Sequence, residues 1–370
     1  MKSFIKPDYN NSNINISATL AEFLGAPNKN TTLPIIKEQL TKGYKNVVFI
    51  CFDGFGINPV EKNLDESSFL RKNIKKVLTS TFPSTTTNAT TSLVNNKLPL
   101  EHGWFGWSMN FAHLNKNVDI FRNTDSLTGE TVDTTNSPLS PNDYYFDHAN
   151  SEYNINSVFP SYVGVKHPER NYTFFDQTEF FETIETICNY EGKQFIYAYN
   201  PEPDSTMHQF GVSSDEAYEL INSISENVEK LANTLKDTLF IITADHGQVD
   251  IEGYVNLYAD KKLLDMLKIY PFLEARAPAF IVKDNKKQEF EEYFTKTYGE
   301  DFVLYKSADL INDGYFGNFG DKAHLLGDYI AIGTYTHKQA LLTPISPLFK
   351  GHHTSLTEEM LVPLIIVESK

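Results

Sequence analysis

The sequence predicts an α/β fold: a three-layer α/β/α sandwich with a central, mostly parallel sheet and a small α+β cap subdomain. Apolar runs typical of buried strands alternate with helical patterns along the chain. Polar residues gather just after the ends of these strands, which is where open α/β sheets place their sites. The chain has 370 residues, more than one hydrophobic core usually serves. We therefore expect a large domain and a smaller one.

The predicted elements follow in chain order. The run 47–52 reads as a central strand because it is apolar throughout, as a strand covered on both faces must be. A second strand precedes Pro83, and a third lies in 193–204. Apolar residues recur at helical spacing through 213–237, and the Ser213/Ser214 region can cap that helix. The run 238–247 is a fourth strand, ending at Asp245, and "GDYIAIGT" is the last core strand.

A change of pattern marks the predicted subdomain. Residues 275–327 read as strand, helix and strand in a short span, so we expect a small inserted cap there, with 1–274 and 328–370 forming the core. The stretch from 110 to about 162 is loop-like, rich in Asn, Asp, Ser, Thr and Tyr. It is either a substrate-facing excursion or a long surface connection.

Composition excludes several classes of partner. The formal charge is −16, so no surplus of Lys or Arg is present for a nucleic acid polymer or an anionic membrane. A small phosphorylated substrate remains compatible, because a metal reverses the local field. Cys51 and Cys188 are expected as reduced, buried thiols. Without a signal-peptide core or an apolar run near ~20 residues, we expect a cytoplasmic protein of undetermined oligomeric state.

Aspartates and histidines follow the predicted strands at four separate places. Taken singly, each is equally well explained as a turn residue or a helix cap, but together they form a mixed set of carboxylates and imidazoles. Zn²⁺ selects such a set, and Mn²⁺ also suits it. Three ligands with an open position are typical of a catalytic metal, and six ligands serve two metals. The candidates are Asp53, Asp204, His208, Asp245, His246, His352 and His353.

A threonine-rich stretch, "STFPSTTTNATTSLV" (80–94), lies where a strand turns into a helix. A hydroxyl at a helix N-terminus faces unpaired backbone N–H groups and the positive end of the helix dipole, which together bind phosphate. A nearby cation lowers the pKa of such a hydroxyl and makes it a nucleophile. An ordinary helix cap is the simpler explanation for the threonines alone, but the metal set beside them favours a nucleophile.

Six segments carry a resemblance to a known family: "VVFICFDGFG", "TFPSTTTNATTSLV", "LPLEHGWFGWSM", "PDSTMHQFG", "ITADHGQ" and "GHHTSLTEEMLVPLI". Their order resembles that of the type I phosphodiesterases and nucleotide pyrophosphatases, which belong to the alkaline phosphatase superfamily. The resemblance runs from about Lys45 to the C-terminus. It implies an alkaline phosphatase-like core and hydrolysis of phosphoric esters, most specifically phosphodiester or nucleotide pyrophosphate bonds.

The resemblance also implies roles for individual residues. One divalent metal would be held by Asp53, Asp245, His246 and the nucleophile, and the other by Asp204, His208 and His353. His353 is preferred to His352 because Thr354, Ser355 and Leu356 follow it. Thr86 is the implied nucleophile, with Thr85 and Thr87 as alternatives. It would attack phosphorus in line and form a phosphothreonine, which water then hydrolyses.

This chain departs from the family pattern around the substrate. Its likeness places Trp107 where an asparagine usually contacts the phosphoryl group, so Asn88 and Asn110 are substitutes for that contact. Trp107 itself either stacks on a flat substrate group or packs in the core. Three alternatives remain: a phosphomonoesterase, a phosphosugar mutase, which the predicted cap would suit, and a non-catalytic member that senses a ligand at its metals.

Overall fold

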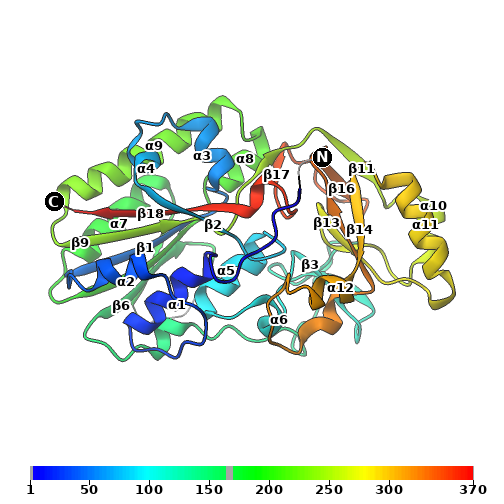
Figure 1. The fold of residues 1–370 in the computed structure, drawn as a ribbon, viewed down its shortest axis with the longest axis horizontal. Coiled ribbons are helices and arrows are strands. Elements are labelled where there is room, and N and C mark those ends of the chain that lie inside the picture. Colours follow the sequence, from blue (N-terminus) through cyan, green and yellow to red (C-terminus); the bar gives the residue numbers. More distant parts are fainter. Residues whose placement is uncertain (1–2, 164–169, 370) are drawn as a thin grey trace.

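Two β-sheets lie side by side in the computed structural model, which describes residues 3–163 and 170–369 (Figure 1). The first sheet has seven strands in the spatial order β2-β18-β9-β1-β8-β6-β7. Within the described residues, every strand of this sheet except β18 runs in the same direction. The prediction of a mostly parallel central sheet is therefore confirmed. The strands are β1 (Asn46–Phe52), β2 (Ile74–Thr79), β6 (Asn154–Pro160), β7 (Arg170–Phe174), β8 (Gln194–Asn200), β9 (Thr238–Thr243) and β18 (Leu361–Glu368).

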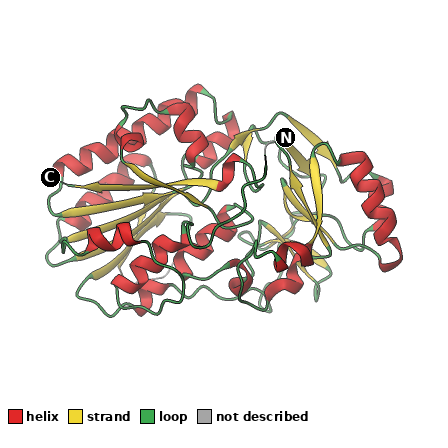
Figure 2. Cartoon of the chain, in the orientation of Figure 1, coloured by secondary structure: helices red, strands yellow, loops and turns green. Residues whose placement is uncertain are grey.

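Helices cover both faces of this sheet and complete a three-layer sandwich (Figure 2). One layer contains α1 (Ile14–Phe23), α2 (Pro34–Leu40) and α5 (Thr86–Asn95). The other contains α3 (Ile57–Asn63), α4 (Phe69–Lys72), α7 (Gln177–Cys188), α8 (Asp204–Phe210) and α9 (Asp215–Thr234). Because helices hide both faces, β1 is buried at all seven positions, as its continuous apolar sequence predicts.

The helix α9 shows how local sequence sets an element's bounds. It begins after Ser214, whose side chain accepts a hydrogen bond from the backbone N–H of Ala217. Ala217, Ile221 and Val228 lie on its buried face, at the helical spacing seen in the sequence. The helix therefore packs one apolar stripe on the sheet, as predicted.

A second seven-stranded sheet stands beside the first, at the right of Figure 1, in the order β14-β15-β13-β12-β3-β4-β5. Its strands are antiparallel: β3 (Ser108–Phe111), β4 (Lys116–Asp119), β5 (Thr124–Asp125), β12 (Phe272–Glu274), β13 (Ala277–Phe280), β14 (Phe302–Lys306) and β15 (Tyr329–Gly333). Separate apolar clusters form around it, one including Phe105, Phe272 and Ile330 and another including Phe280 and Phe290. The helices of this part are α6 (Pro99–His102), α10 (Lys261–Met266), α11 (Lys287–Tyr298) and α12 (Ser307–Asn312).

Two short strand pairs lie in the chain segments that connect the two sheets. The strand β10 (Val249–Asp250) pairs antiparallel with β17 (Gly351–His352), and β11 (Gly253–Asn256) pairs parallel with β16 (Lys338–Leu341). Brief 3₁₀ turns complete the described elements: η1 (Tyr145–His148), η2 (Asp284–Lys286), η3 (Lys322–Leu326) and η4 (Glu358–Met360).

The structure corrects two expectations about these elements. The strand predicted at 327–334 was assigned to the core, but β15 pairs with β13 and β14 in the second sheet. That sheet is also larger than the span 275–327, since it takes β12 and three strands from 108–125. The stretch 110–162 is not merely loop, because it contains β4, β5 and the core strand β6. Strands of two to four polar residues carry no readable periodicity.

Two further expectations concern cysteines and membranes. Cys51 and Cys188 are both buried free thiols, as predicted. Among the helices in the described part of the chain, none is both long enough and apolar enough to cross a membrane.

Candidate active site

Three aspartates meet at the carboxyl edge of the first sheet. Asp53 follows β1 directly, Asp245 follows β9, and Asp204 is the first residue of α8, just beyond β8. The strands β9, β1 and β8 are adjacent, so their ends bring these carboxylates together. The site therefore forms where the strand pattern predicts it.

Two glycines after β1 allow the loop that follows this strand to lie close to the loop that follows β9. Gly54 has a φ of +72°, and its backbone N–H donates to Asp245 Oδ1 at 3.1 Å. A Cβ atom on Gly56 would lie 2.3 Å from the Cα of Gly247. The sequence "DGFG" thus sets Asp53 against the loop that carries Asp245.

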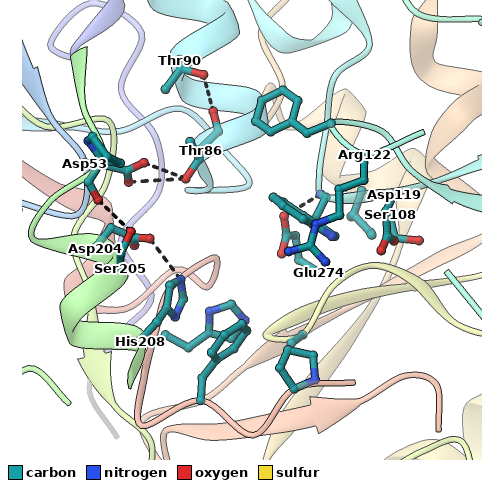
Figure 3. Close-up of a pocket in the computed structure, with 18 of the residues that line it drawn as sticks. Asp53, Thr86, Thr90, Ser108, Asp119, Arg122, Asp204, Ser205, His208 and Glu274 are labelled. Atoms are coloured by element: carbon teal, nitrogen blue, oxygen red, sulfur yellow. Dashed lines mark hydrogen bonds and ion pairs between the residues drawn. The ribbon is translucent and has the colours of Figure 1, made fainter. Parts of the chain in front are cut away.

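The three neighbouring threonines have different surroundings. Thr86 is the first residue of α5, and its Oγ1 lies 3.2 Å from both Asp53 Oδ2 and His246 Nε2. Thr85 instead donates to Glu274 Oε1 at 2.7 Å. The hydroxyl of Thr87 is buried and has no hydrogen-bond partner among the described residues. Only Thr86 of these three therefore places its hydroxyl among the candidate metal ligands (Figure 3).

The candidate ligands for the first metal form one compact group. His246 Nε2 lies 3.2 Å from Asp53 Oδ1 and 3.4 Å from Asp245 Oδ2. Ligand atoms of these three residues all lie within 4.8 Å of one another, and all three residues are buried. The structure thus brings together the predicted set Asp53, Asp245 and His246 at a size suited to one cation.

The second predicted set lies next to the first. His208 Nε2 is 3.2 Å from Asp204 Oδ2, and His353 Nε2 is 3.8 Å from Asp204 Oδ1. By mutual distance, His353 groups both with Asp204 and His246 and with His208 and His352. The members of the second set are therefore neighbours. A ligand atom of His352 also lies within 4.8 Å of ligand atoms of His208 and His353.

Contacts with backbone carbonyls distinguish the three predicted histidine ligands from His352. The Nδ1 atoms of His208, His246 and His353 lie 2.8, 2.9 and 3.1 Å from the carbonyls of Gly351, Gly247 and Ser84. A carbonyl only accepts, so each Nδ1 carries the proton and each Nε2 keeps a lone pair for a cation. His352 Nδ1 is buried and finds no such partner in the described chain. This contrast favours His353 over His352 as the ligand.

The charges of the carboxylates also suit cations. Burial raises the pKa of Asp53 well above its usual range, and the charges of Asp245 and Asp204 raise it further. Burial and the Asp204 charge raise the pKa of Asp245 to about 7. Asp245 Oδ2 is buried and accepts no hydrogen bond from the described residues. Three crowded carboxylates with an unused oxygen fit divalent cations, whose charge would offset their repulsion.

Further residues support the ligands but were not found from the sequence. The Tyr199 hydroxyl donates to Asp53 Oδ2, and the Gln248 amide donates to Asp204 Oδ1. Tyr199 pairs in register with Cys51, two residues before Asp53, so the strand register of β1 and β8 was the signal that could have revealed it. Such partners orient ligating carboxylates.

A buried ion pair fixes the loop that carries His353. Arg276 Nε donates to Glu359 Oε1 at 3.0 Å, and both side chains are fully buried. The backbone N–H of Arg276 donates to Thr354 Oγ1 at 3.2 Å. Arg276 lies between β12 and β13, so the second sheet helps to hold a ligand loop of the first.

A cavity of about 1250 Å³ opens between the two sheets at these residues. Asp53, Thr86, Asp204 and His208 line it, as does Trp107. Asn88 does not, because its buried amide donates to the carbonyl of Pro83 at 2.8 Å. The structure thus places Trp107 where it can contact a substrate and Asn88 beneath the cavity wall.

Asn110, the alternative to Asn88, lies on β3. Its amide donates to Asn117 Oδ1 at 3.0 Å, on the neighbouring strand. It is not among the residues that line the cavity. Neither asparagine therefore faces the cavity.

The mostly parallel sandwich, with three aspartates and four histidines clustered at the carboxyl ends of its strands, defines an α/β protein with a candidate metal centre. The sequence profile of the type I phosphodiesterase / nucleotide pyrophosphatase family matches residues 47–327. The chain belongs to this family.

Curated relatives match over shorter segments. Ectonucleotide pyrophosphatase/phosphodiesterase family member 7 from Rattus norvegicus is 26% identical over 156 residues, which is 40% of this chain and 31% of the relative. The Homo sapiens protein of the same name is 30% identical over 130 residues, 33% of this chain and 24% of the relative. The match thus spans less than a third of the length of these curated relatives.

Solved structures match over most of the chain. Murine ectonucleotide pyrophosphatase / phosphodiesterase 5 has a TM-score of 0.63 at 17% identity, covering 87% of this chain and 88% of that chain. Phosphonoacetate hydrolase from Sinorhizobium meliloti has a TM-score of 0.63 at 13% identity, covering 87% and 89%. At these identities the likeness establishes the fold.

Proposed function

We propose that this protein hydrolyses phosphoric esters, most specifically phosphodiester or nucleotide pyrophosphate bonds, with Thr86 as nucleophile and two divalent metals. The observation that carries the proposal is the place of Thr86 Oγ1. It lies 3.2 Å from Asp53 and His246, at the start of a ten-residue helix. A non-catalytic member has no need to retain a hydroxyl at that point together with every ligand.

The chain's own residues supply three functions. The N-terminus of α5 presents backbone N–H groups to the phosphoryl oxygens. Thr86 Oγ1 loses its proton to solvent and attacks phosphorus, so that an Oγ1–P bond forms as the bond to the leaving oxygen breaks. Water later cleaves the Oγ1–P bond, which returns a proton to Thr86 and releases the phosphoryl product. Tyr199 and Gln248 hold Asp53 and Asp204 in position.

The candidate ligands fit two cations of the kind that mixed carboxylate and imidazole sets select. Asp53, Asp245 and His246 would hold one together with Thr86, and Asp204, His208 and His353 would hold the other. Bound divalent cations, Zn²⁺ or Mn²⁺, would neutralise charge on the phosphoryl oxygens and lower the pKa of the hydroxyl.

Known structures support a small phosphorylated substrate, with nucleotides as the first class to test. A structure of murine ectonucleotide pyrophosphatase / phosphodiesterase 5 is described as an inactive threonine-to-alanine variant in complex with AMP. Its TM-score to this chain is 0.62 at 18% identity. The cavity here, at about 1250 Å³, has room for groups on both sides of a phosphorus atom.

The test compares two chromogenic substrates on zinc-loaded protein. We expect kcat/KM for bis-p-nitrophenyl phosphate to exceed that for p-nitrophenyl phosphate, since the cavity accommodates a second ester group. A ratio well below one would overturn the diesterase proposal in favour of a monoesterase or phosphosugar mutase. No turnover of either substrate by fully loaded protein would favour a ligand-sensing member.

A further inference from the structure

The cavity has two walls of different origin (Figure 3). Asp53, Thr86, Asp204 and His208 come from the first sheet and its helices. The facing wall belongs to the second sheet and its loops, and it includes Trp107, Ser108, Asp119, Arg122 and Glu274. The proposed reaction uses these four residues of the first wall, but it uses none of the five named on the second.

Arg122 is the one lysine or arginine among the described residues that line the cavity. It follows β4, in the turn before β5, and its side chain is labelled on the second-sheet wall in Figure 3. The protein as a whole carries a formal charge of −16. The cavity lining therefore carries the positive charge of Arg122 in a molecule that is acidic overall.

The ring of Trp107 forms a platform beside the exposed Arg122 side chain. Its guanidinium lies 5.3 Å from the centre of the Trp107 ring, a cation–π contact. Trp107 packs edge-on against Phe121 at 6.0 Å, and its backbone N–H donates to Glu274 Oε1 at 2.7 Å. A guanidinium that rests on such a platform loses little freedom when it binds a ligand.

The carboxylates on this wall are already engaged. Asp119 Oδ1 accepts from Ser126 Oγ at 2.6 Å, and Glu274 Oε1 accepts from Thr85 Oγ1 and from Trp107. Asp119 is close enough for the Arg122 charge to act on it, but within the described residues Arg122 forms no ion pair. Its fork of N–H donors remains open toward the cavity, and such a fork matches a carboxylate or phosphate.

We propose that Arg122 binds a second anionic group of the substrate, so that the site prefers phosphoric esters whose leaving group carries a phosphate or carboxylate. This inference rests on the proposed function, because it assumes that the scissile phosphorus lies at Thr86. It makes Arg122 a specificity-determining residue rather than a catalytic one.

The test uses matched competitive inhibitors of bis-p-nitrophenyl phosphate hydrolysis. Phosphonocarboxylates of increasing chain length are each compared with the alkylphosphonate of the same length, which lacks the second anion. We expect the wild-type protein to bind the phosphonocarboxylate about tenfold more tightly at the length that spans the two walls, the scale of a partly exposed charge-assisted contact.

Two variants assign the effect. Arg122→Gln should bring the inhibitor ratio close to one at every length, whereas Arg122→Lys should keep part of it. Lys116→Gln is the control, because Lys116 lies on the same hairpin, pairs with Asp125 at 2.7 Å, and does not line the cavity. It should leave the ratio unchanged.

Each other outcome has a separate meaning. A ratio near one at all lengths in the wild type, or a ratio that survives Arg122→Gln, would overturn the inference. If Lys116→Gln lowers the ratio as much as Arg122→Gln, overall charge and not Arg122 is responsible. Absence of any turnover in the wild type contradicts the proposed function instead, and titration of the same inhibitors by calorimetry then still tests Arg122.

Discussion

The two walls of the cavity are built in different ways. The first-sheet wall takes Asp53 and Asp204 from just beyond the ends of adjacent parallel strands, β1 and β8. The second-sheet wall takes Trp107 and Arg122 from the β3–β5 region and Glu274 from β12, more than a hundred residues further along the chain. The difference suggests a division of work, in which the first wall performs the chemistry and the second selects the substrate and supports the site.

Replacing Thr86 gives the largest effect that this division predicts. Thr86→Ala should lower kcat by a factor of about 10³ or more, because it removes the attacking atom, while Asp53, Asp245 and His246 would still hold the first metal. Thr87→Val is the matched control, since it removes a neighbouring hydroxyl that has no partner among the described residues. Steady-state kinetics with metal analysis distinguishes the two. Equal losses in both variants would remove Thr86 from its role.

The adjacent histidines sharpen the ligand assignment on the same wall. His353→Ala should weaken zinc binding by more than about 100-fold, since loss of a ligand exceeds the cost of losing a supporting group. His352→Ala should weaken it less than about tenfold, because no carbonyl prepares His352 to bind through Nε2. Competition with a chromogenic chelator measures both affinities. The reverse order would make His352 the ligand.

Glu274 tests the supporting role of the second wall, with the smallest effect. Burial raises its pKa from 4.5 to about 7, so between these values the folded protein holds a proton that the unfolded chain has lost. Rising pH therefore destabilises the folded wild-type protein across this window. Glu274→Gln cannot ionise, and it keeps an oxygen to accept from Thr85 and Trp107.

The free energy of unfolding of Glu274→Gln should accordingly equal that of the wild type near pH 5. Near pH 8 it should be higher than that of the wild type by on the order of 2 kcal/mol. Urea unfolding of zinc-loaded protein at both pH values measures the gap. A gap that stays constant with pH would mean that Glu274 is ionised in both states and does not carry the raised pKa.

The sequence predicted the two walls unequally, for a physical reason. Parallel core strands are long apolar runs, so β1, β8 and β9 could be found, and with them Asp53, Asp204 and Asp245. The strands β4 and β5 have four and two residues of mostly polar sequence, so the hairpin that carries Arg122 looked like loop. The apolar strand β15 has the same signature as a core strand, which is why it was assigned to the wrong sheet.

The choice among the threonines needed three-dimensional geometry. Counting along "PSTTTN" leaves Thr85, Thr86 and Thr87 equivalent within one residue. Only the start of α5 relative to Asp53 and His246 separates them, because one residue rotates a helical side chain by about 100°. The proposed substrate contacts of Trp107 and Arg122 depend on the meeting of two sheets, which no local pattern encodes.

The measurement that tests the central proposal most directly is identification of the covalent intermediate. Zinc-loaded protein is mixed with bis-p-nitrophenyl phosphate, quenched in acid during turnover, digested and analysed by mass spectrometry. We predict a p-nitrophenyl phosphoryl group on Thr86, absent from Thr86→Ala. Multiple turnovers with no modification at any time point, or modification of Thr85 or Thr87 instead, would contradict the assignment of Thr86 as the nucleophile.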